Sequence, residues 1–457
     1  MKEPQSYIGA TAATLGRAIA AGDLDPVSFA ECLLERIEAQ TSPIFLTVTR
    51  DRALAEATAA RDRAKTGRML SPLDGVPIAW KDLIDMAGET TTAASDLFRD
   101  AAPAGTDAPI VANAAAAGMV SLGKLNLTEF AYSGIGLNPH YGTPLNPRST
   151  DGPRSPGGSS SGSGAAVAGD LAPIAIGTDT GGSVRIPAAF NGVTGYKSSE
   201  GRIDATGVFA LSKTLDTVGP LAQTVEDCIL ADAVMRGAVG GIIRRADPKA
   251  LRVFVTESVV LDALEPEVAS NFEATLARLE KAGVAVSRGP LPEFAEAAAL
   301  AGEIGTITAA EAYFEHAARV DGPDRDRIDR RVVARIDIGK AISAAGLIRL
   351  QRARMAVMQS LEAKLDGALI AMPTAPHVAP LTAPLEADDA LFHKVNLMTL
   401  RNTAIGNFLN LPGVAIPNGT GDGGMPTSFL LSAPANHDER LLGAALALEG
   451  LIRGDAA

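Results

Sequence analysis

A glycine- and serine-rich segment, residues 155–197, constrains the fold of this chain more than any other part of the sequence. It opens with SPGGSSSGSG, continues through an apolar run over 171–176, and turns again at TDTGGS, which ends at Ser183. Glycine permits close approaches and backbone conformations that other residues cannot adopt. Consecutive small residues can therefore aim several backbone N–H groups at one point, where an anion or an oxyanion binds. A serine in such a turn is either a nucleophile or a turn former.

Spacing excludes two common phosphate-binding motifs in this segment. A P-loop ends in Gly-Lys-Ser or Gly-Lys-Thr, and the run contains no lysine in that place. A dinucleotide fingerprint needs glycine three positions after Gly164, where the chain has Val167. Two serine-bearing glycine turns remain, separated by a predicted helix and a short buried strand.

Three stretches of the sequence resemble the amidase signature family. They are GGSSSGSGAAVA over 157–168, TDTGGSVRIPAAFNGVTGYK over 178–197, and GVPIAWKD over 75–82. The similarity continues weakly toward both ends, so it covers nearly the whole chain. The resemblance implies an α/β/α sandwich and hydrolysis of amides by a serine nucleophile.

The resemblance also implies three catalytic roles. Ser183 is the expected nucleophile, Ser159 the bridging serine, and Lys81 the base. Ser159 and Ser183 stand 24 positions apart, as the family pattern requires. In the family the peptide bond before the bridging serine is cis. Lysine is a weak base at its reference pKa of about 10.4, so Lys81 must be buried to become neutral near pH 7.

The residues around the second glycine turn are expected to stabilise the tetrahedral oxyanion. The predicted donors are four backbone N–H groups, those of Thr180, Gly181, Gly182 and Ser183. Three neighbouring side chains are interpreted as supports that hold the turns, namely Ser160, Asp179 and Arg185.

A loop rich in turn residues over 132–142 is expected to line the substrate pocket, because such loops commonly carry binding residues. The resemblance to the amidase signature family implies that parts of 310–405 contribute as well. The predicted pocket residues are Tyr132, Ser133, Gly134 and Ile135. His140, in the same loop, is interpreted as structural rather than as a base. Residues 324–335 alternate in charge and are interpreted as a solvent-exposed face.

Strand and helix patterns alternate along the chain and predict a single α/β domain over 1–457. A mixed sheet is expected, with helices on both faces. The signature core spans about 70–235, and a peripheral β-α-β and helical part spans about 250–410. Thr11 and Asp25 are predicted helix caps, the latter followed by proline at the first helical position.

Charge and cysteine content narrow the function classes. The formal net charge is −12 and no basic run is present, which argues against direct binding of nucleic acid or of an anionic membrane. Cys32 and Cys228 are far apart and predict no disulfide framework. No H-E-x-x-H or C-x-x-C spacing occurs, so neither a metal nor an organic cofactor is expected. We expect a cytoplasmic monomer or homodimer without a membrane span.

The sequence thus predicts a serine hydrolase that cleaves the C–N bond of a small non-peptide amide through an acyl-enzyme. Primary amides, anilides and other N-acyl compounds are candidate substrates, and the same machinery suits esters and carbamates. An alternative is a glutaminase-type amidase subunit of a tRNA-dependent amidotransferase, which needs a partner protein.

Overall fold

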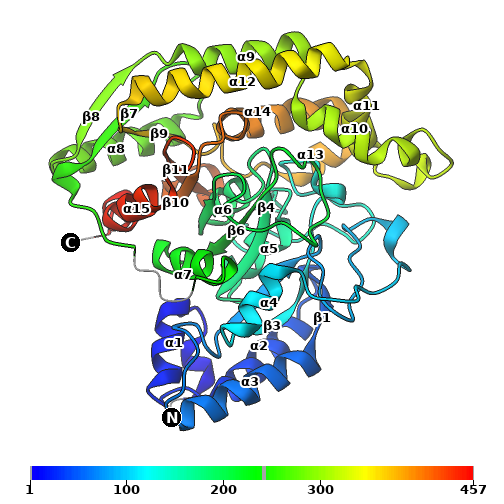
Figure 1. Ribbon diagram of the computed structural model, residues 1–457, viewed down its shortest axis with the longest axis vertical. Coiled ribbons are helices and arrows are strands. Elements are labelled where there is room, and N and C mark those ends of the chain that lie inside the picture. The colour runs from blue at the N-terminus through cyan, green and yellow to red at the C-terminus, as the bar shows by residue number, and fades with distance from the viewer. Residues whose placement is uncertain (1–2, 239–242, 456–457) are drawn as a thin grey trace.

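One mixed sheet organises the computed structural model, which describes residues 3–238 and 243–455 (Figure 1). Within those residues the sheet has eleven strands. Their order across the sheet is β1 (Phe45–Val48), β3 (Val120–Leu125), β2 (Pro77–Lys81), β4 (Ile174–Asp179), β6 (Thr217–Ala222), β5 (Thr194–Lys197), β10 (Gly413–Thr420), β11 (Pro426–Ser432), β9 (Leu369–Pro373), β7 (Arg252–Thr256) and β8 (Ala285–Gly289).

Strand direction brings two distant parts of the sequence to one edge of the sheet. β2 lies between β3 and β4 and runs parallel to both. The carboxyl ends of parallel neighbours lie at the same edge, where open α/β sheets place their ligands. Lys81 ends β2 and Asp179 ends β4, so the predicted base and the glycine turn that follows β4 meet there.

The second half of the chain extends the same sheet. β7 pairs in parallel with both β8 and β9. The helix α8 (Pro266–Lys281) connects β7 to β8 and packs on β10 and β11. The β-α-β crossover expected after residue 250 is therefore present, and it belongs to the main sheet.

Helices cover the sheet and account for the rest of the regular structure. The others are α1 (Ala12–Ala20), α2 (Pro26–Glu38), α3 (Arg50–Lys65), α4 (Pro109–Ala116), α5 (Ser161–Ala168), α6 (Arg185–Asn191), α7 (Val225–Met235), α9 (Pro292–Ile304), α10 (Ile307–Val320), α11 (Arg330–Asp337), α12 (Ala344–Leu365), α13 (Thr382–Ala387), α14 (Asp389–Phe408) and α15 (Asp438–Arg453). The predicted α/β class with a mixed sheet and covering helices is confirmed. Among the described helices, none combines the length and the apolar character that a membrane span requires.

Local sequence signals explain where several helices begin. Thr11 and Asp25 cap α1 and α2 with their side-chain oxygens, as predicted. α14 begins at Asp389. The carboxylate of Asp388 accepts hydrogen bonds from the Ala390 and Leu391 N–H groups and caps this helix.

Two apolar clusters fix the helices over the active edge of the sheet. The larger one follows the sheet through the molecule. A second cluster joins Leu83 and Phe130, near the ends of β2 and β3, to Val332 and Ile336 of α11. α11 contacts α10, and in Figure 1 this pair lies beyond the sheet, close to α14. The packing therefore places α10, α11 and α14 above the glycine turns.

Candidate active site

Lys81 lies at the end of β2 with no exposed surface. Its Nζ donates to Ser159 Oγ at 2.7 Å and to Thr178 Oγ1 at 2.8 Å. Burial lowers the pKa of Lys81 to about 7, while the carboxylates of Asp216 and Asp179 oppose that shift. A lysine with this pKa exchanges its proton near neutral pH.

Ser159 is held between the two glycine turns. The peptide bond between Gly158 and Ser159 is cis. The Ser159 carbonyl accepts the Thr128 N–H at 3.0 Å, while the Gly158 N–H donates to the Gly134 carbonyl at 2.8 Å. Ser160 joins the two turns directly, since its N–H donates to the Ser183 carbonyl at 3.3 Å and its Oγ donates to Thr178 O at 3.3 Å.

The turn after β4 presents Ser183 and free backbone donors. In the described part of the chain, no hydrogen bond occupies the N–H groups of Thr180, Gly181 and Ser183, or the Ser183 hydroxyl. The Gly182 N–H differs, because it donates to Asp179 Oδ1 at 2.8 Å. Gly182 is therefore a correction to the predicted donor set. Its φ is +135°, and a Cβ there would lie 2.2 Å from Thr403 Oγ1, so the turn requires glycine.

A buried ion pair holds this turn from behind. Arg185 Nε and Nη2 donate to the two Asp179 carboxylate oxygens at 2.9 Å each, and neither side chain is exposed. Asp179 also accepts the Val184 N–H at 3.1 Å. Burial alone would raise the pKa of Asp179. The charge and hydrogen bonds of Arg185 oppose this effect and hold the pKa below its usual range. Asp179 and Arg185 contact the turn, and neither lines the cavity that opens over Ser183.

Asp216 is a residue near the site that sequence reasoning missed. It precedes β6, the antiparallel neighbour of β4. Its carboxylate accepts the Thr180 hydroxyl and the N–H groups of Leu211 and Ser212. Burial raises the pKa of Asp216 to about 6, and the hydrogen bonds limit that rise. The signal available in the sequence was an isolated carboxylate at the start of an apolar strand.

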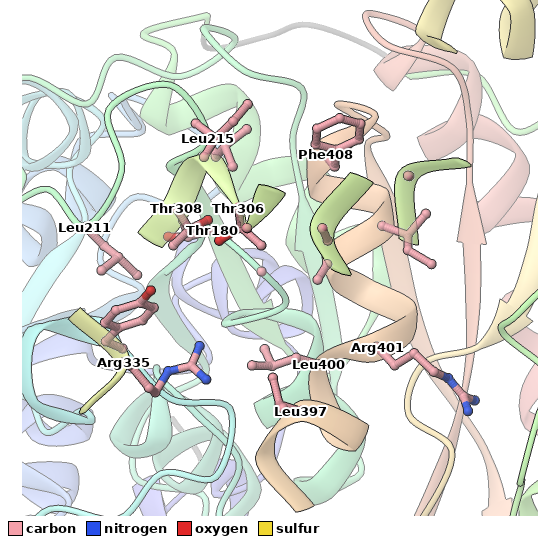
Figure 2. Close-up of a pocket in the computed structure, with 18 of the residues that line it drawn as sticks. Thr180, Leu211, Leu215, Thr306, Thr308, Arg335, Leu397, Leu400, Arg401 and Phe408 are labelled. Atoms are coloured by element: carbon pink, nitrogen blue, oxygen red, sulfur yellow. The ribbon is translucent and has the colours of Figure 1, made fainter. Parts of the chain in front are cut away.

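A cavity of about 310 Å³ opens over Ser183 (Figure 2). Tyr132 and Ser133 line it, as predicted. Gly134 and Ile135 do not, which corrects the prediction. The Gly134 N–H donates to Asn396 Oδ1, and Ile135 packs in a separate apolar cluster with Leu137. Gly134 thus supports the cis turn through its carbonyl, and Ile135 packs into the separate apolar cluster instead of facing the cavity.

Most of the cavity wall comes from helices far along the sequence. Leu397 and Leu400 of α14, Ala301 of α9, and Leu350 of α12 contribute apolar side chains. Arg335 of α11 lines it as well, which corrects the interpretation of residues 324–335 as a solvent-exposed face. Helical spacing could have shown this, because Arg335 lies one turn after the buried Val332, on the same face of α11.

His140 is absent from the cavity lining. Its Nε2 lies 3.1 Å from Glu129 Oε2 and its Nδ1 lies 3.6 Å from Asp96 Oδ2. The contact with the Glu129 carboxylate raises the pKa of His140, and partial burial opposes that rise. The ion-pair geometry agrees with the structural interpretation of this histidine. Among the described residues, no group of three or more His, Cys, Asp or Glu side chains is arranged to hold a metal ion.

Comparison with known proteins identifies the family. The model of the Amidase family matches residues 29–442, and the chain belongs to that family. It is 35% identical over 413 residues to the 2-amino-5-chloromuconic acid deaminase of Comamonas testosteroni, covering 88% of this chain and 87% of the relative. It is 32% identical over 483 residues to a glutamyl-tRNA(Gln) amidotransferase subunit of Cupriavidus necator, covering 95% of each.

A solved amidase structure has the same fold. It superposes with a TM-score of 0.85 at 26% identity and covers 98% of this chain and all of the other. The chain is thus an amidase-family hydrolase acting on C–N bonds.

Proposed function

We propose that this protein hydrolyses small non-peptide amides through an acyl-enzyme formed on Ser183. The carrying observation is the buried contact between Lys81 Nζ and Ser159 Oγ at 2.7 Å, beside the cavity that Ser183 lines. A neutral Lys81 takes the proton of the Ser159 hydroxyl while Ser159 takes that of Ser183. The Ser183 oxygen then attacks the amide carbon.

The backbone donors of the turn stabilise the resulting oxyanion. The N–H groups of Thr180 and Gly181 are unoccupied and next to the nucleophile, and the N–H of Ser183 completes the set. Loss of one such donor typically costs about 10²–10³ in rate. The proton held on Lys81 returns through Ser159 to the leaving nitrogen, the C–N bond breaks, and water hydrolyses the acyl ester by the same relay.

The leaving group determines how strongly turnover depends on the proton relay. An amide nitrogen must be protonated to leave, so amides require the full relay. Esters and carbamates with good leaving groups fit the same nucleophile and oxyanion site, and we include them as secondary substrates. The supporting residues Asp179 and Arg185 act through the turn and are positioning residues.

The experiment is active-site labelling combined with turnover. A fluorophosphonate should modify Ser183 in the wild type, as located by peptide mass spectrometry. Ser183→Ala should lose labelling and amide turnover while keeping the wild-type unfolding midpoint. Ser161→Ala is a matched control, because Ser161 is also a buried serine, begins α5 directly after the first glycine turn, and has no assigned role. An adduct on another serine, or turnover retained in Ser183→Ala, contradicts the proposal.

The relation to the amidotransferase proteins supports a second candidate. The similarity to the Cupriavidus necator protein spans nearly all of both chains. In that role the same site would hydrolyse glutamine and pass ammonia to a partner protein. Assaying the isolated chain on glutamine and on simple amides separates the two: efficient turnover of simple amides without a partner supports the free-standing hydrolase.

A further inference from the structure

Arg335 stands out in the cavity because its charge has no partner. In the described part of the chain, its guanidinium forms no ion pair and no hydrogen bond, and its Nε is buried without an acceptor. The guanidinium instead lies over the Tyr132 ring, whose centroid is 4.5 Å from the guanidinium carbon. Figure 2 shows the guanidinium facing Leu400 and Leu397 across the cavity.

A second arginine on the same wall shows what a structural arginine looks like here. Arg401 donates through Nη1 to the Asp262 carbonyl at 2.6 Å and through Nη2 to the Val260 carbonyl at 3.2 Å. Its Nε donates to Asn402 Oδ1 at 3.0 Å. In Figure 2 its side chain extends away from Leu400. Arg401 thus stabilises the wall, whereas the donors of Arg335 remain available.

Arg335 is partly buried in a mostly apolar cavity, and a charge that is partly removed from water is stabilised when it is paired or hydrogen-bonded. Burial lowers the pKa of Arg335, because loss of hydration disfavours the charged form of the guanidinium. Stacking on an aromatic face leaves the edge of the guanidinium open, and that edge matches a carboxylate with two parallel hydrogen bonds. A bound carboxylate would supply the missing charge.

The rest of the cavity limits what else the ligand can carry. Its described lining contains no aspartate or glutamate, and the residues facing Arg335 are leucines. An α-ammonium group would find no opposite charge there and would lose its hydration. A ligand with one carboxylate and an otherwise apolar body suits this wall.

We propose that the substrate is an amide that carries one carboxylate and no ammonium group, and that Arg335, held by Tyr132, binds this carboxylate. This inference rests on the proposed function, since it concerns the same cavity. It makes Arg335 a specificity-determining residue. It also disfavours free glutamine, whose α-ammonium has no place at this wall.

Matched substrates test the proposal. Glutaramate, pentanamide and L-glutamine share a primary amide at the end of a five-carbon chain. Glutaramate differs from pentanamide by its carboxylate and from glutamine by the absent ammonium. Hippurate and N-ethylbenzamide form a second pair, with the charge on the leaving amine. We expect kcat/KM to favour the carboxylate member of at least one pair by about tenfold to hundredfold, the range of a charge-assisted hydrogen bond. We also expect glutaramate to exceed glutamine.

Variants of Arg335 test whether this residue causes the preference for the carboxylate substrate. Arg335→Gln should abolish the preference for the carboxylate member, mainly through KM. Arg335→Lys keeps the charge but loses the planar fork, so it should retain part of it. Arg330→Gln is the matched control: Arg330 lies on the same helix, is exposed and pairs with Asp389 at 2.6 Å. It should keep the wild-type preference, which excludes a general effect of removing one positive charge.

The outcomes separate this inference from the proposed function. Wild-type enzyme that hydrolyses amides without preferring the carboxylate member of either pair overturns the inference and leaves the hydrolase intact. A preference that survives in Arg335→Gln, or glutamine turned over better than glutaramate, also overturns it. Wild-type enzyme whose Ser183 is not labelled and that hydrolyses none of these amides overturns the proposed function itself.

Discussion

The pH dependence of amide turnover tests the proposed role of Lys81 most directly. Lys81 acts as a base only in its neutral form, and burial lowers its pKa to about 7. The neutral form is present above this pKa and is lost as the pH falls through it. The acid limb of kcat/KM should therefore have its midpoint near pH 7, since kcat/KM reports groups of the free enzyme.

The magnitude follows from the pKa. With a pKa of about 7, the neutral fraction is about 0.1 at pH 6 and about 0.9 at pH 8, so kcat/KM should rise about tenfold between them. An exposed lysine at the reference pKa of about 10.4 would be neutral in only about 4 molecules per 10⁴ at pH 7. Burial at the end of β2 thus increases the available base by about 10³-fold.

The assay compares an amide with an activated ester of the same acyl group, for the wild type and Lys81→Ala. The variant should lose about 10²–10⁴-fold on the amide, the usual contribution of general acid–base catalysis. It should lose less on the ester, because an activated leaving group needs no proton. Circular dichroism and the unfolding midpoint establish that the variant is folded.

Two results would refute this reasoning. An acid limb that persists unchanged in Lys81→Ala would belong to another group. Near-wild-type amide turnover in Lys81→Ala would make the lysine a structural residue, and His140 would then be the first alternative base to test by substitution.

Two further predictions concern the carboxylates around the site. Asp216 raises the pKa of Lys81 by its charge, so Asp216→Asn should move the acid limb of kcat/KM to lower pH; an unmoved limb or a move to higher pH contradicts the coupling. Arg185→Met leaves Asp179 buried without its cation and should lower the free energy of unfolding by about 3–5 kcal/mol, measured in urea. A loss below about 1 kcal/mol would show that the ion pair contributes little.

The sheet and the two glycine turns could be predicted because their signals are local. A short apolar strand ending in Lys81, glycines at positive φ, and an Asx-capped helix start each depend on residues close in sequence. The resemblance then placed the two serines and the lysine in register. The structure brings Lys81 and Ser159 into contact as that register implies.

Parts of 310–405 were expected to line the pocket, but the individual residues of the cavity wall could not be predicted, because they come together only through long-range packing. Charge alternation over 324–335 describes composition but not which helix face meets the core. Arg331 is buried and forms an ion pair with Asp329 at 2.8 Å, and Arg335 faces the cavity. The commitment of the Gly182 N–H to Asp179 likewise depends on a side-chain rotamer that no spacing rule provides.

Helix α14 connects the two halves of the site. Thr403 Oγ1 donates to the Gly181 carbonyl at 2.6 Å, and Asn407 Oδ1 accepts from Arg185 at 2.5 Å, so one part of the helix holds the glycine turn after β4. Leu397 and Leu400, one to two turns earlier, line the cavity instead. We therefore expect substitutions at the two leucines to act on substrate choice, and those at Thr403 and Asn407 to act on the turn. Because Lys81, the proposed base, is on β2 and not on this helix, we expect substitutions in the cavity wall to change substrate preference without altering the proposed proton relay.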